Sequence, residues 1–119
     1  MSKVEENLSV RRALALLSPL GPVRARALFG GYGIYLDEVM FALIAWDRLY
    51  FRVDGETKVR WAAEGGEPFV YEGKSAPVEM PYWTAPPHAE DSPDALEPWA
   101  CLALQTARRL RAAKTKTAR

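Results

Sequence analysis

The chain of 119 residues is long enough for one domain, and its 49% hydrophobic and 26% charged residues are typical of a globular protein rather than a disordered one. One cysteine and one histidine exclude an internal disulfide and a zinc site of the usual ligand count within a single chain. The longest apolar run, Val39 to Trp46, has eight residues, whereas a membrane helix needs roughly 20. The start of the chain is polar and lacks the pattern of a signal peptide. We therefore expect a cytoplasmic protein with no membrane segment.

The first predicted element is a helix, because Leu8, Ala13, Leu14 and Leu17 recur at helical spacing before Ser18-Pro19. The period then changes to two over three stretches, 23–36, 39–45 and 49–53. The links between them are too short for a crossover helix, so they predict a three-stranded antiparallel meander. The links do not indicate which type of turn joins the strands.

The second half predicts a short helix at 56–64, ended by Gly65-Gly66, and two further strands at 69–72 and 78–83. Ser92 followed by Pro93 resembles a helix start. Pro98 predicts a break, with the main helix beginning there. The order α-β-β-β-α-β-β-α indicates a two-layer α+β sandwich, with one domain over 1–112 and a basic, frayed tail over 113–119.

The glycines of Gly30-Gly31-Tyr32-Gly33 interrupt the first strand and predict a bend or bulge. A phosphate-binding loop would lead into a helix, but here another strand follows. The acidic residues stand singly or in turns, and His88 lies in a proline-rich loop with no partner that the sequence places beside it. We therefore predict no catalytic, cofactor-binding or metal-binding residue.

Both alternating residue sets of 39–46 are apolar, although a two-layer domain covers only one face of its sheet. Exposed apolar patches usually mark interfaces. We predict that Met40, Ile44 and Trp46 lie on the bare face and contact a protein partner or a second copy of the chain.

The C-terminal segment contains six basic residues and no acid after residue 103, although the net charge of the chain is only +1. Such a segment can contact nucleic-acid phosphates, or it can simply solubilise a helix end, which is the interpretation we favour. The residues concerned are Arg108, Arg109, Arg111, Lys114, Lys116 and Arg119.

Several motifs resemble the N-terminal domain of the TfoX (Sxy) family. The stretch 27–44, ALFGGYGIYLDEVMFALI, resembles its signature, and DRLYFRVD at 47–54, EPFVY at 67–71, MPYW at 80–83 and LEPWA at 96–100 follow in the family's order. The resemblance implies a fold like that of the secretion-chaperone and YgaC group, in a bacterial cytoplasmic protein linked to transcriptional regulation of competence for DNA uptake. It supplies no catalytic residues. Full-length regulators of this kind carry a second, helical domain, so we expect a stand-alone N-terminal domain.

Three functional hypotheses follow. The first is a non-catalytic regulatory or interaction domain that acts through protein contacts or as a homodimer. The second is a protein associated with nucleic acid through its basic tail. The third is an enzyme or small-ligand binder with a cleft near Tyr82, Trp83 and His88.

Overall fold

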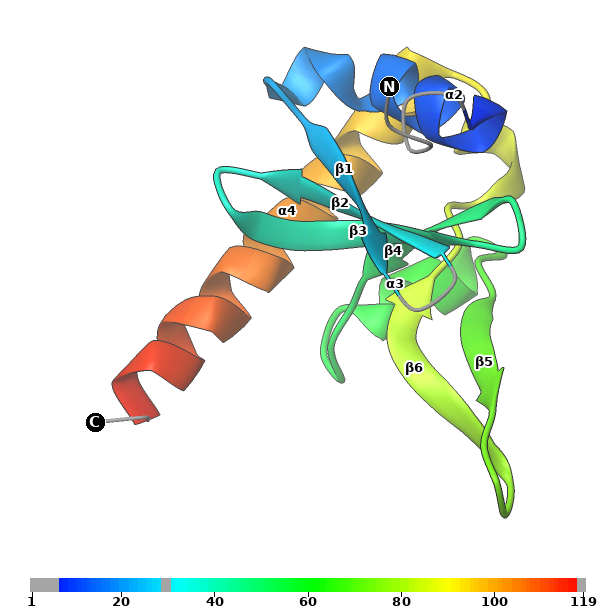
Figure 1. The fold of residues 1–119 in the computed structure, drawn as a ribbon, viewed down its shortest axis with the longest axis vertical. Helices are drawn as coiled ribbons and strands as arrows, with labels where there is room; N and C mark the ends of the chain where they lie inside the picture. Colours follow the sequence, from blue (N-terminus) through cyan, green and yellow to red (C-terminus); the bar gives the residue numbers. More distant parts are fainter. Residues whose placement is uncertain (1–6, 29–30, 118–119) are drawn as a thin grey trace.

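The computed structural model describes residues 7–28 and 31–117, without the side chains of 114–117. Its six strands form one antiparallel sheet in the order β1-β2-β3-β4-β6-β5, with the helices packed on one side (Figure 1). The elements are α2 (Leu8–Leu17), the 3-10 turn η1 (Ser18–Leu20), β1 (Arg24–Leu28), β2 (Gly31–Leu36), β3 (Val39–Ala45), β4 (Arg48–Arg52), α3 (Lys58–Ala63), β5 (Pro68–Glu72), β6 (Pro77–Trp83), the 3-10 turn η2 (Pro87–Ala89) and α4 (Pro93–Thr117).

The predicted two-layer α+β class is confirmed, with one strand more than expected. The stretch 23–36 is two strands, β1 and β2, which pair antiparallel with Leu28 opposite Gly31. The predicted single, bent strand is therefore wrong, and the meander has four strands. Phe29 and Gly30 lie outside the described residues. Gly31 has a steric role, because a Cβ atom there would lie 2.2 Å from the carbonyl oxygen of Ile44 on β3.

Both following hairpins are closed by two residues with positive φ, the pattern of a type I′ turn. Asp37 and Glu38 have φ of 51° and 67°, and Trp46 and Asp47 have φ of 49° and 61°. None of the four is glycine, which explains why the usual sequence signature of this turn is missing. The turn type that the sequence left open is thus fixed by backbone geometry.

A β-bulge at Phe41 changes which residues of β3 share a face. Tyr35 of β2 pairs with Met40, whereas the preceding Ile34 pairs with Ala42, so Phe41 is the extra residue. Phe41 and Ala42 are consequently both fully buried. Strict alternation would place Met40 and Ile44 on one face. That assignment is wrong, because the bulge turns Ile44 toward the helices.

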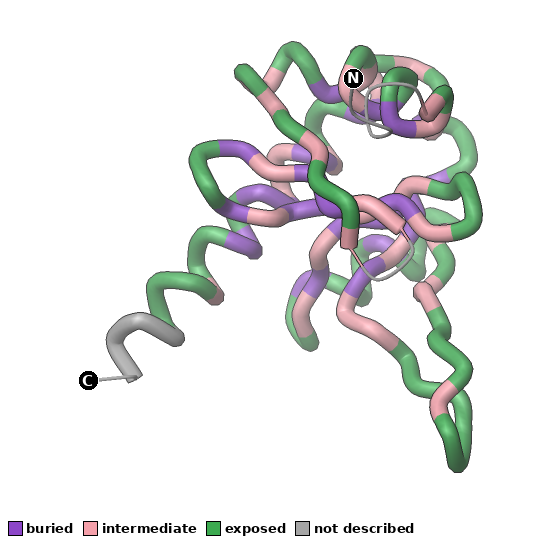
Figure 2. Tube along the Cα trace, viewed as in Figure 1, coloured by how far each residue is buried: buried purple, intermediate pink, exposed green. Residues whose placement is uncertain are grey.

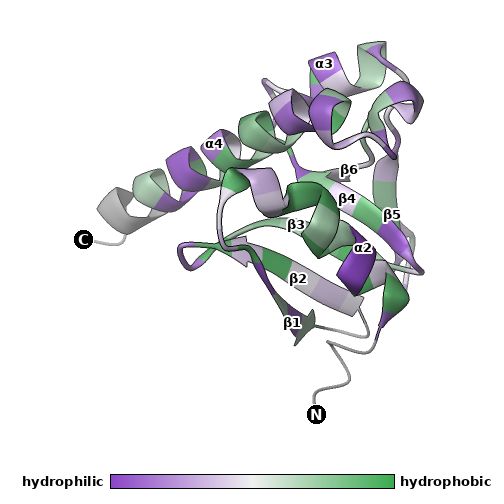
Figure 3. Ribbon diagram, turned by 90° about the horizontal axis from the view of Figure 1, so that it is seen from above, coloured by the Kyte–Doolittle hydropathy of each residue, from purple (hydrophilic) through white to green (hydrophobic). Residues whose placement is uncertain are grey.

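The core lies between the sheet and the layer formed by α2 and α4, and Figure 3 shows α2 in front of the strands. Asn7 caps α2, since its side-chain oxygen accepts a hydrogen bond from the backbone N–H of Val10 at 3.1 Å. In the same layer the fully buried ring of Trp61 in α3 packs between Phe51 of β4 and Trp99 of α4, with ring centroids 5.6 and 4.8 Å away. Burial is concentrated in the middle of the sheet and in the helix surfaces that face it (Figure 2).

Two predicted helix boundaries are confirmed and one is wrong. After α3, the backbone N–H groups of Gly65 and Gly66 donate to the carbonyls of Ala62 and Trp61, which closes the helix as a Schellman motif. Ser92 caps α4 by accepting from the N–H of Ala95 at 3.2 Å. The helix then continues through Pro98 instead of beginning there. Pro98 forfeits only its own bond to the carbonyl four residues back, and the buried residues after it hold the helix on the sheet.

The β5–β6 hairpin is the part of the sheet that projects farthest from α2 (Figure 1). Its two strands pair along most of their length, but β6 joins β4 through only two residue pairs, Phe51 with Trp83 and Arg52 with Tyr82. Its base is fastened by Thr84, whose buried hydroxyl accepts from the N–H of Glu67 at 3.0 Å. The hairpin therefore leaves the sheet as a separate arm beyond that short junction.

Candidate interaction surface

The helix-free face of the sheet holds an apolar groove of about 440 Å³, which we call the open-face groove. Its lining comes from β1, β2, β3, β5 and β6, and none of the described residues in it is charged. The side chains that shape it are Met40, Leu43, Phe69, Tyr71, Met80 and Tyr82. A concave apolar surface on the uncovered side of a two-layer domain is the feature that the sequence led us to expect there.

The floor of the groove is set by the strand register. Leu43 of β3 stands opposite Gly33 of β2 and Tyr50 of β4, and directly opposed residues share a face. Gly33 leaves space that the neighbouring side chains occupy, because a Cβ atom there would lie 2.9 Å from the Sδ atom of Met40 and 3.0 Å from the ring of Tyr35. The groove is thus deeper over β2, where Gly33 has no side chain, than over β3, where Leu43 projects into it.

The wall of the groove is the β5–β6 hairpin. The ring of Phe69 lies 5.0 Å from that of Tyr50 and 5.5 Å from that of Trp46, centroid to centroid. These contacts hold the base of the hairpin over β4. Farther out, Tyr71 and Val78 are 55% and 48% exposed, so the wall presents apolar surface to solvent.

The three predicted interface residues have different positions. Met40 lines the groove and is half-buried, as expected of a residue on that face. Trp46 is 73% exposed at the β3–β4 turn, beside the groove. Ile44 also borders the groove, but it is 3% exposed and its side chain belongs to the core because of the bulge at Phe41.

Sequence reasoning missed Leu43 and the hairpin residues. Strict alternation along 39–46 places Leu43 on the same face as Val39 and Phe41, whereas the bulge puts its side chain on the groove side. The signal for the hairpin was present, since Phe69 and Tyr71 on one strand, and Met80 and Tyr82 on the next, are large residues spaced by two. In an antiparallel hairpin, such pairs gather on one face.

Two arginines flank the groove, each over an aromatic ring. The guanidinium of Arg26 on β1 lies 5.7 Å from the ring centre of Tyr35, and that of Arg52 on β4 lies 5.5 Å from that of Tyr82. Burial raises the pKa of the Tyr82 hydroxyl above its ordinary value, and Arg52 opposes part of that shift. Within the described part of the chain, no carboxylate forms an ion pair with either arginine.

The basic C-terminal segment is helical as far as Thr117, and its first three arginines contact the acidic turns of the sheet. Arg108 pairs with Asp37 at 3.3 Å and Arg109 with Asp54 at 2.8 Å, while Arg111 donates to the backbone carbonyl of Glu38 at 3.0 Å. The side chains of Lys114, Lys116 and Arg119 lie outside the described residues. The contacts place part of the predicted nucleic-acid site against the protein itself.

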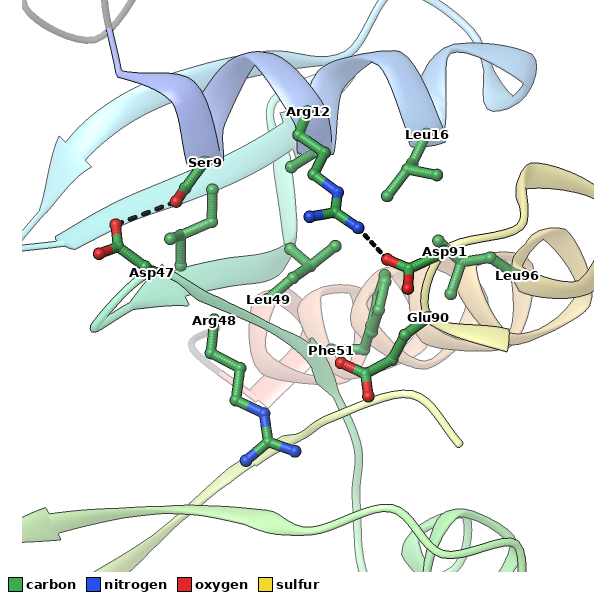
Figure 4. Close-up of a pocket in the computed structure, with 12 residues that line it drawn as sticks. Ser9, Arg12, Leu16, Asp47, Arg48, Leu49, Phe51, Glu90, Asp91 and Leu96 are labelled. Carbon is green, nitrogen blue, oxygen red and sulfur yellow. Dashed lines mark hydrogen bonds and ion pairs between the residues drawn. The ribbon is translucent and has the colours of Figure 1, made fainter. Parts of the chain in front are cut away.

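A second, smaller pocket of about 140 Å³ lies between α2, β4 and the loop before α4, and it is the polar one (Figure 4). Three of its charged groups, Arg12, Asp47 and Asp91, are engaged within the pocket, whereas Glu90 points to no partner among the described residues. Ser9 donates to Asp47 at 2.9 Å, and Arg12 forms an ion pair with Asp91 across the pocket. Arg48 pairs outward with Glu67 at 3.0 Å. The pocket is therefore an intramolecular junction that ties α2 to the loop.

Tyr82, Trp83 and His88, which the third hypothesis placed near a common cleft, do not lie around one. Tyr82 lines the open-face groove, whereas Trp83 stands opposite Phe51 on the helix-covered face. His88 is exposed in η2. In the chain as described, no three His, Cys, Asp or Glu side chains are grouped so that they could hold a metal ion. No helix among the described residues is long and apolar enough to cross a bilayer.

The molecule is thus a small α+β domain with helices on one face of an antiparallel sheet and an apolar groove on the other. The sequence model described as "TfoX N-terminal domain" matches residues 15–107, most of the chain, and the chain belongs to that family. The resemblance found in the sequence motifs is confirmed.

A named relative is the "DNA transformation protein TfoX1" of Aliivibrio fischeri. It is 31% identical over 96 residues, which cover 81% of this chain and 44% of the relative. The chain therefore spans less than half of the length of this curated relative, and the similarity concerns the N-terminal domain family rather than a whole protein.

Proposed function

We propose that this protein is a non-catalytic interaction domain in the regulation of competence for DNA uptake, that it works in the bacterial cytoplasm, and that it acts by contacting a protein through the open-face groove. Membership of the TfoX N-terminal domain family and the name of the relative, a DNA transformation protein, support the link to DNA transformation. The observation that carries the mode of action is the apolar groove on the helix-free face.

The physical case for a protein contact rests on exposed apolar surface. Tyr71 and Val78 on the hairpin wall and Trp46 at its base leave about half or more of their surface in water. Covering such side chains releases roughly 25 cal/mol for each Å² of apolar area, and aromatic residues often dominate the energy of an interface. A groove about 440 Å³ in volume can accept several side chains of a partner.

The non-catalytic part of the proposal is supported by the polar pocket of Figure 4. General acid–base chemistry needs a group that is free to exchange a proton with a substrate. Here Asp47 and Asp91 are engaged by Ser9 and Arg12 of α2. These contacts give the pocket a role in holding the helix.

The experiment is a transformation assay in the source bacterium with the native gene replaced by variants. Tyr71→Asp puts a charge on the exposed wall without disturbing the core, and Val59→Asp, at 65% exposure on α3, makes the same kind of change on the helix side. We expect Tyr71→Asp to lower transformation frequency about tenfold or more, as the loss of one well-packed contact would. Val59→Asp should leave it unchanged.

Immunoblotting and circular dichroism establish that both variants accumulate and fold. Normal transformation with Tyr71→Asp at normal protein level would contradict the use of the groove. Light scattering on the purified protein distinguishes a homodimer, which Tyr71→Asp would dissociate, from a monomer that binds a different protein.

The nucleic-acid hypothesis stays a prediction with its own test. Binding of duplex DNA is measured at low and high salt for the full chain and for a chain ending at residue 113. If the tail binds phosphates, truncation should weaken binding and flatten its salt dependence. Equal affinity of the two chains would remove the tail from consideration.

A further inference from the structure

The flanks of the open-face groove are positively charged while its lining is apolar, and this contrast identifies the chemistry of its occupant. Arg24 and Arg26 stand on the β1 side, opposite Tyr35 and Gly33, and so on the same face as the floor. Arg48 and Arg52 stand on β4, opposite Ala45 and Tyr82. Arginines therefore stand along β1 at one side of the groove and at both ends of β4, between the floor strand β3 and the hairpin wall.

Among the residues that the structure describes, two of these four arginines have carboxylate partners. Arg24 pairs with Glu38 at 2.8 Å and Arg48 with Glu67 at 3.0 Å. Among the described residues, the guanidinium of Arg26 lies over the ring of Tyr35, and that of Arg52 lies over the ring of Tyr82 and interacts with its hydroxyl. Within the described part of the chain, this face thus holds two positive charges that form no ion pair with a carboxylate.

From these observations we propose that the open-face groove binds an acidic segment of another protein, one that places large apolar side chains in the groove and carboxylates against Arg26 and Arg52. This inference rests on the proposed function and adds the chemical class of the partner. Carboxylates suit guanidinium groups because two parallel hydrogen bonds can form, and pairs beside an apolar surface are less screened by salt than exposed ones.

A second copy of the chain is disfavoured by the same charges. In a symmetric dimer through this face, the Arg26 and Arg52 groups of both copies would gather around one groove, and like charges brought together oppose association. The carboxylates on or beside the face, Glu38 and Glu67, are already paired within the chain. An acidic partner would neutralise the charges of Arg26 and Arg52, whereas a second copy would bring further positive charges beside them.

A nucleic acid is disfavoured by the state of the aromatic rings. Bases bind to sheet surfaces by stacking on free ring faces. On the floor and at the base of the wall, the rings of Tyr35 and Tyr82 already have guanidinium groups over them, and Phe69 packs against Tyr50 and Trp46. The exposed rings, Tyr71 and Trp46, stand at the rim of the groove. The rest of the floor, Met40 and Leu43, is aliphatic surface that suits protein side chains.

The test is a selection of displayed random 12-residue peptides on the full-length protein. We expect Asp and Glu, together with Leu or aromatic residues, to rise at least about twofold above their starting frequency, in line with charge complementarity at interfaces. A selected peptide is then synthesised with a fluorophore and its Kd measured by anisotropy. Its affinity should fall about tenfold with Arg26→Glu, several-fold with Arg52→Gln, and again with Tyr71→Asp.

The matched control is Arg11→Glu with Arg60→Glu, two exposed arginines on α2 and α3. It changes the net charge more than Arg26→Glu does but leaves the groove untouched, so it should keep the affinity. Arg26 is exposed on an edge strand, and Arg26→Glu is checked for folding by circular dichroism. Replacing the peptide carboxylates by lysines should restore binding to Arg26→Glu.

Four results would overturn the inference, and they separate it from the proposed function. Selected peptides that need Tyr71 but show no enrichment of Asp or Glu would disprove the acidic partner and leave the groove as a protein site. Both proposals would be disproved if the selected peptides bound equally well to the Tyr71 and Arg26 variants. They would also be disproved if a 12-nucleotide oligothymidylate bound more tightly than the peptides and depended on Tyr71. A dimer that Tyr71→Asp dissociates would show that a second copy fills the groove.

Discussion

The guanidinium of Arg109 in α4 donates to the carboxylate of Asp54, in the loop after β4, at 2.8 Å. The other oxygen of that carboxylate accepts from the backbone N–H groups of Thr57 at 2.8 Å and Glu56 at 3.1 Å, and from the Thr57 hydroxyl at 3.0 Å. One side chain thus orders the turn that leads into α3 and anchors the C-terminal half of α4. The bond from Thr57 above all, with help from Arg109, lowers the pKa of Asp54 from 3.8 to about 2.

Replacing Asp54 should therefore cost stability in a pH-dependent way. Asp54→Ala removes several hydrogen bonds to a charged acceptor, and we expect a loss of about 1–3 kcal/mol in urea unfolding at pH 7. The folded-state pKa lies below the unfolded one, so the contribution is complete above about pH 4 and is lost as the pH falls toward 2. The difference between the two proteins should shrink over that window.

Glu56→Ala is the control for Asp54→Ala, because its exposed side chain lies in the same turn. It should change stability by less than about 0.5 kcal/mol at either pH. A stability difference between wild type and Asp54→Ala that stays constant from pH 7 to pH 2.5 would show that the carboxylate does not stabilise the turn as described.

Gly31→Ala should destabilise the protein strongly because the position touches backbone. The new Cβ atom would lie 2.2 Å from the carbonyl oxygen of Ile44, and a main chain in the middle of a sheet cannot move aside cheaply. Overpacking of this kind costs about 1–3 kcal/mol, measured as a fall in the free energy of unfolding. Gly55→Ala is the matched variant, since nothing lies within 4 Å of its Cβ position. Equal stability of the two variants would refute the steric role of Gly31.

Pro98→Ala should stabilise the protein. Pro98 is exposed within α4 and cannot donate a hydrogen bond to the carbonyl of Asp94. Alanine restores the donor and has the highest helix propensity, which we expect to add about 1 kcal/mol after allowing for the greater freedom of the unfolded chain. Calorimetry would show a higher Tm than that of wild type. The control Glu97→Ala, also exposed, should stay near wild type, and a lower Tm for Pro98→Ala would contradict the prediction.

The β5–β6 hairpin should open more readily than the rest of the sheet. It joins β4 through two residue pairs, whereas β2 and β3 pair along their length. We expect amide hydrogens of 70–78 to exchange faster than those of β2 and β3 by native-state mass spectrometry. Phe69→Ala, which removes the ring contacts with Tyr50 and Trp46, should accelerate that exchange further. Unchanged exchange in the variant would mean that the aromatic contacts do not anchor the arm.

The elements that the sequence predicts well are those with local signals. The cap at Ser92, the glycine end of α3 and the apolar periodicity of α2 are each decided by residues within a few positions of one another. The hairpins after residue 31 follow from links too short for any other connection. These local features suffice for the α+β class and for a bare apolar face.

The errors arise where distant packing decides the outcome. The bulge at Phe41 places the side chain of Ile44 on the opposite face of the sheet from the one that alternation predicts. The alternating apolar pattern of the sequence does not indicate the bulge. Pro98 stays helical because residues after it are buried against β3 and β4, a gain that no helix rule contains. The groove wall depends on Phe69 and Tyr71 meeting the main sheet through β6, so its position needs the strand order as well as the strands.

Asp37 and Glu38 both close the β2–β3 hairpin and contact α4. Positive φ at both positions is easier for Asn-Gly, so the acids bend the backbone against its preference. The same turn receives Arg108 through Asp37 and Arg111 through the carbonyl of Glu38. A chain optimised only for hairpin closure would keep that carbonyl but lose the Asp37 carboxylate that holds α4 to the sheet. In this domain a two-residue hairpin turn also fastens the longest described helix to the sheet.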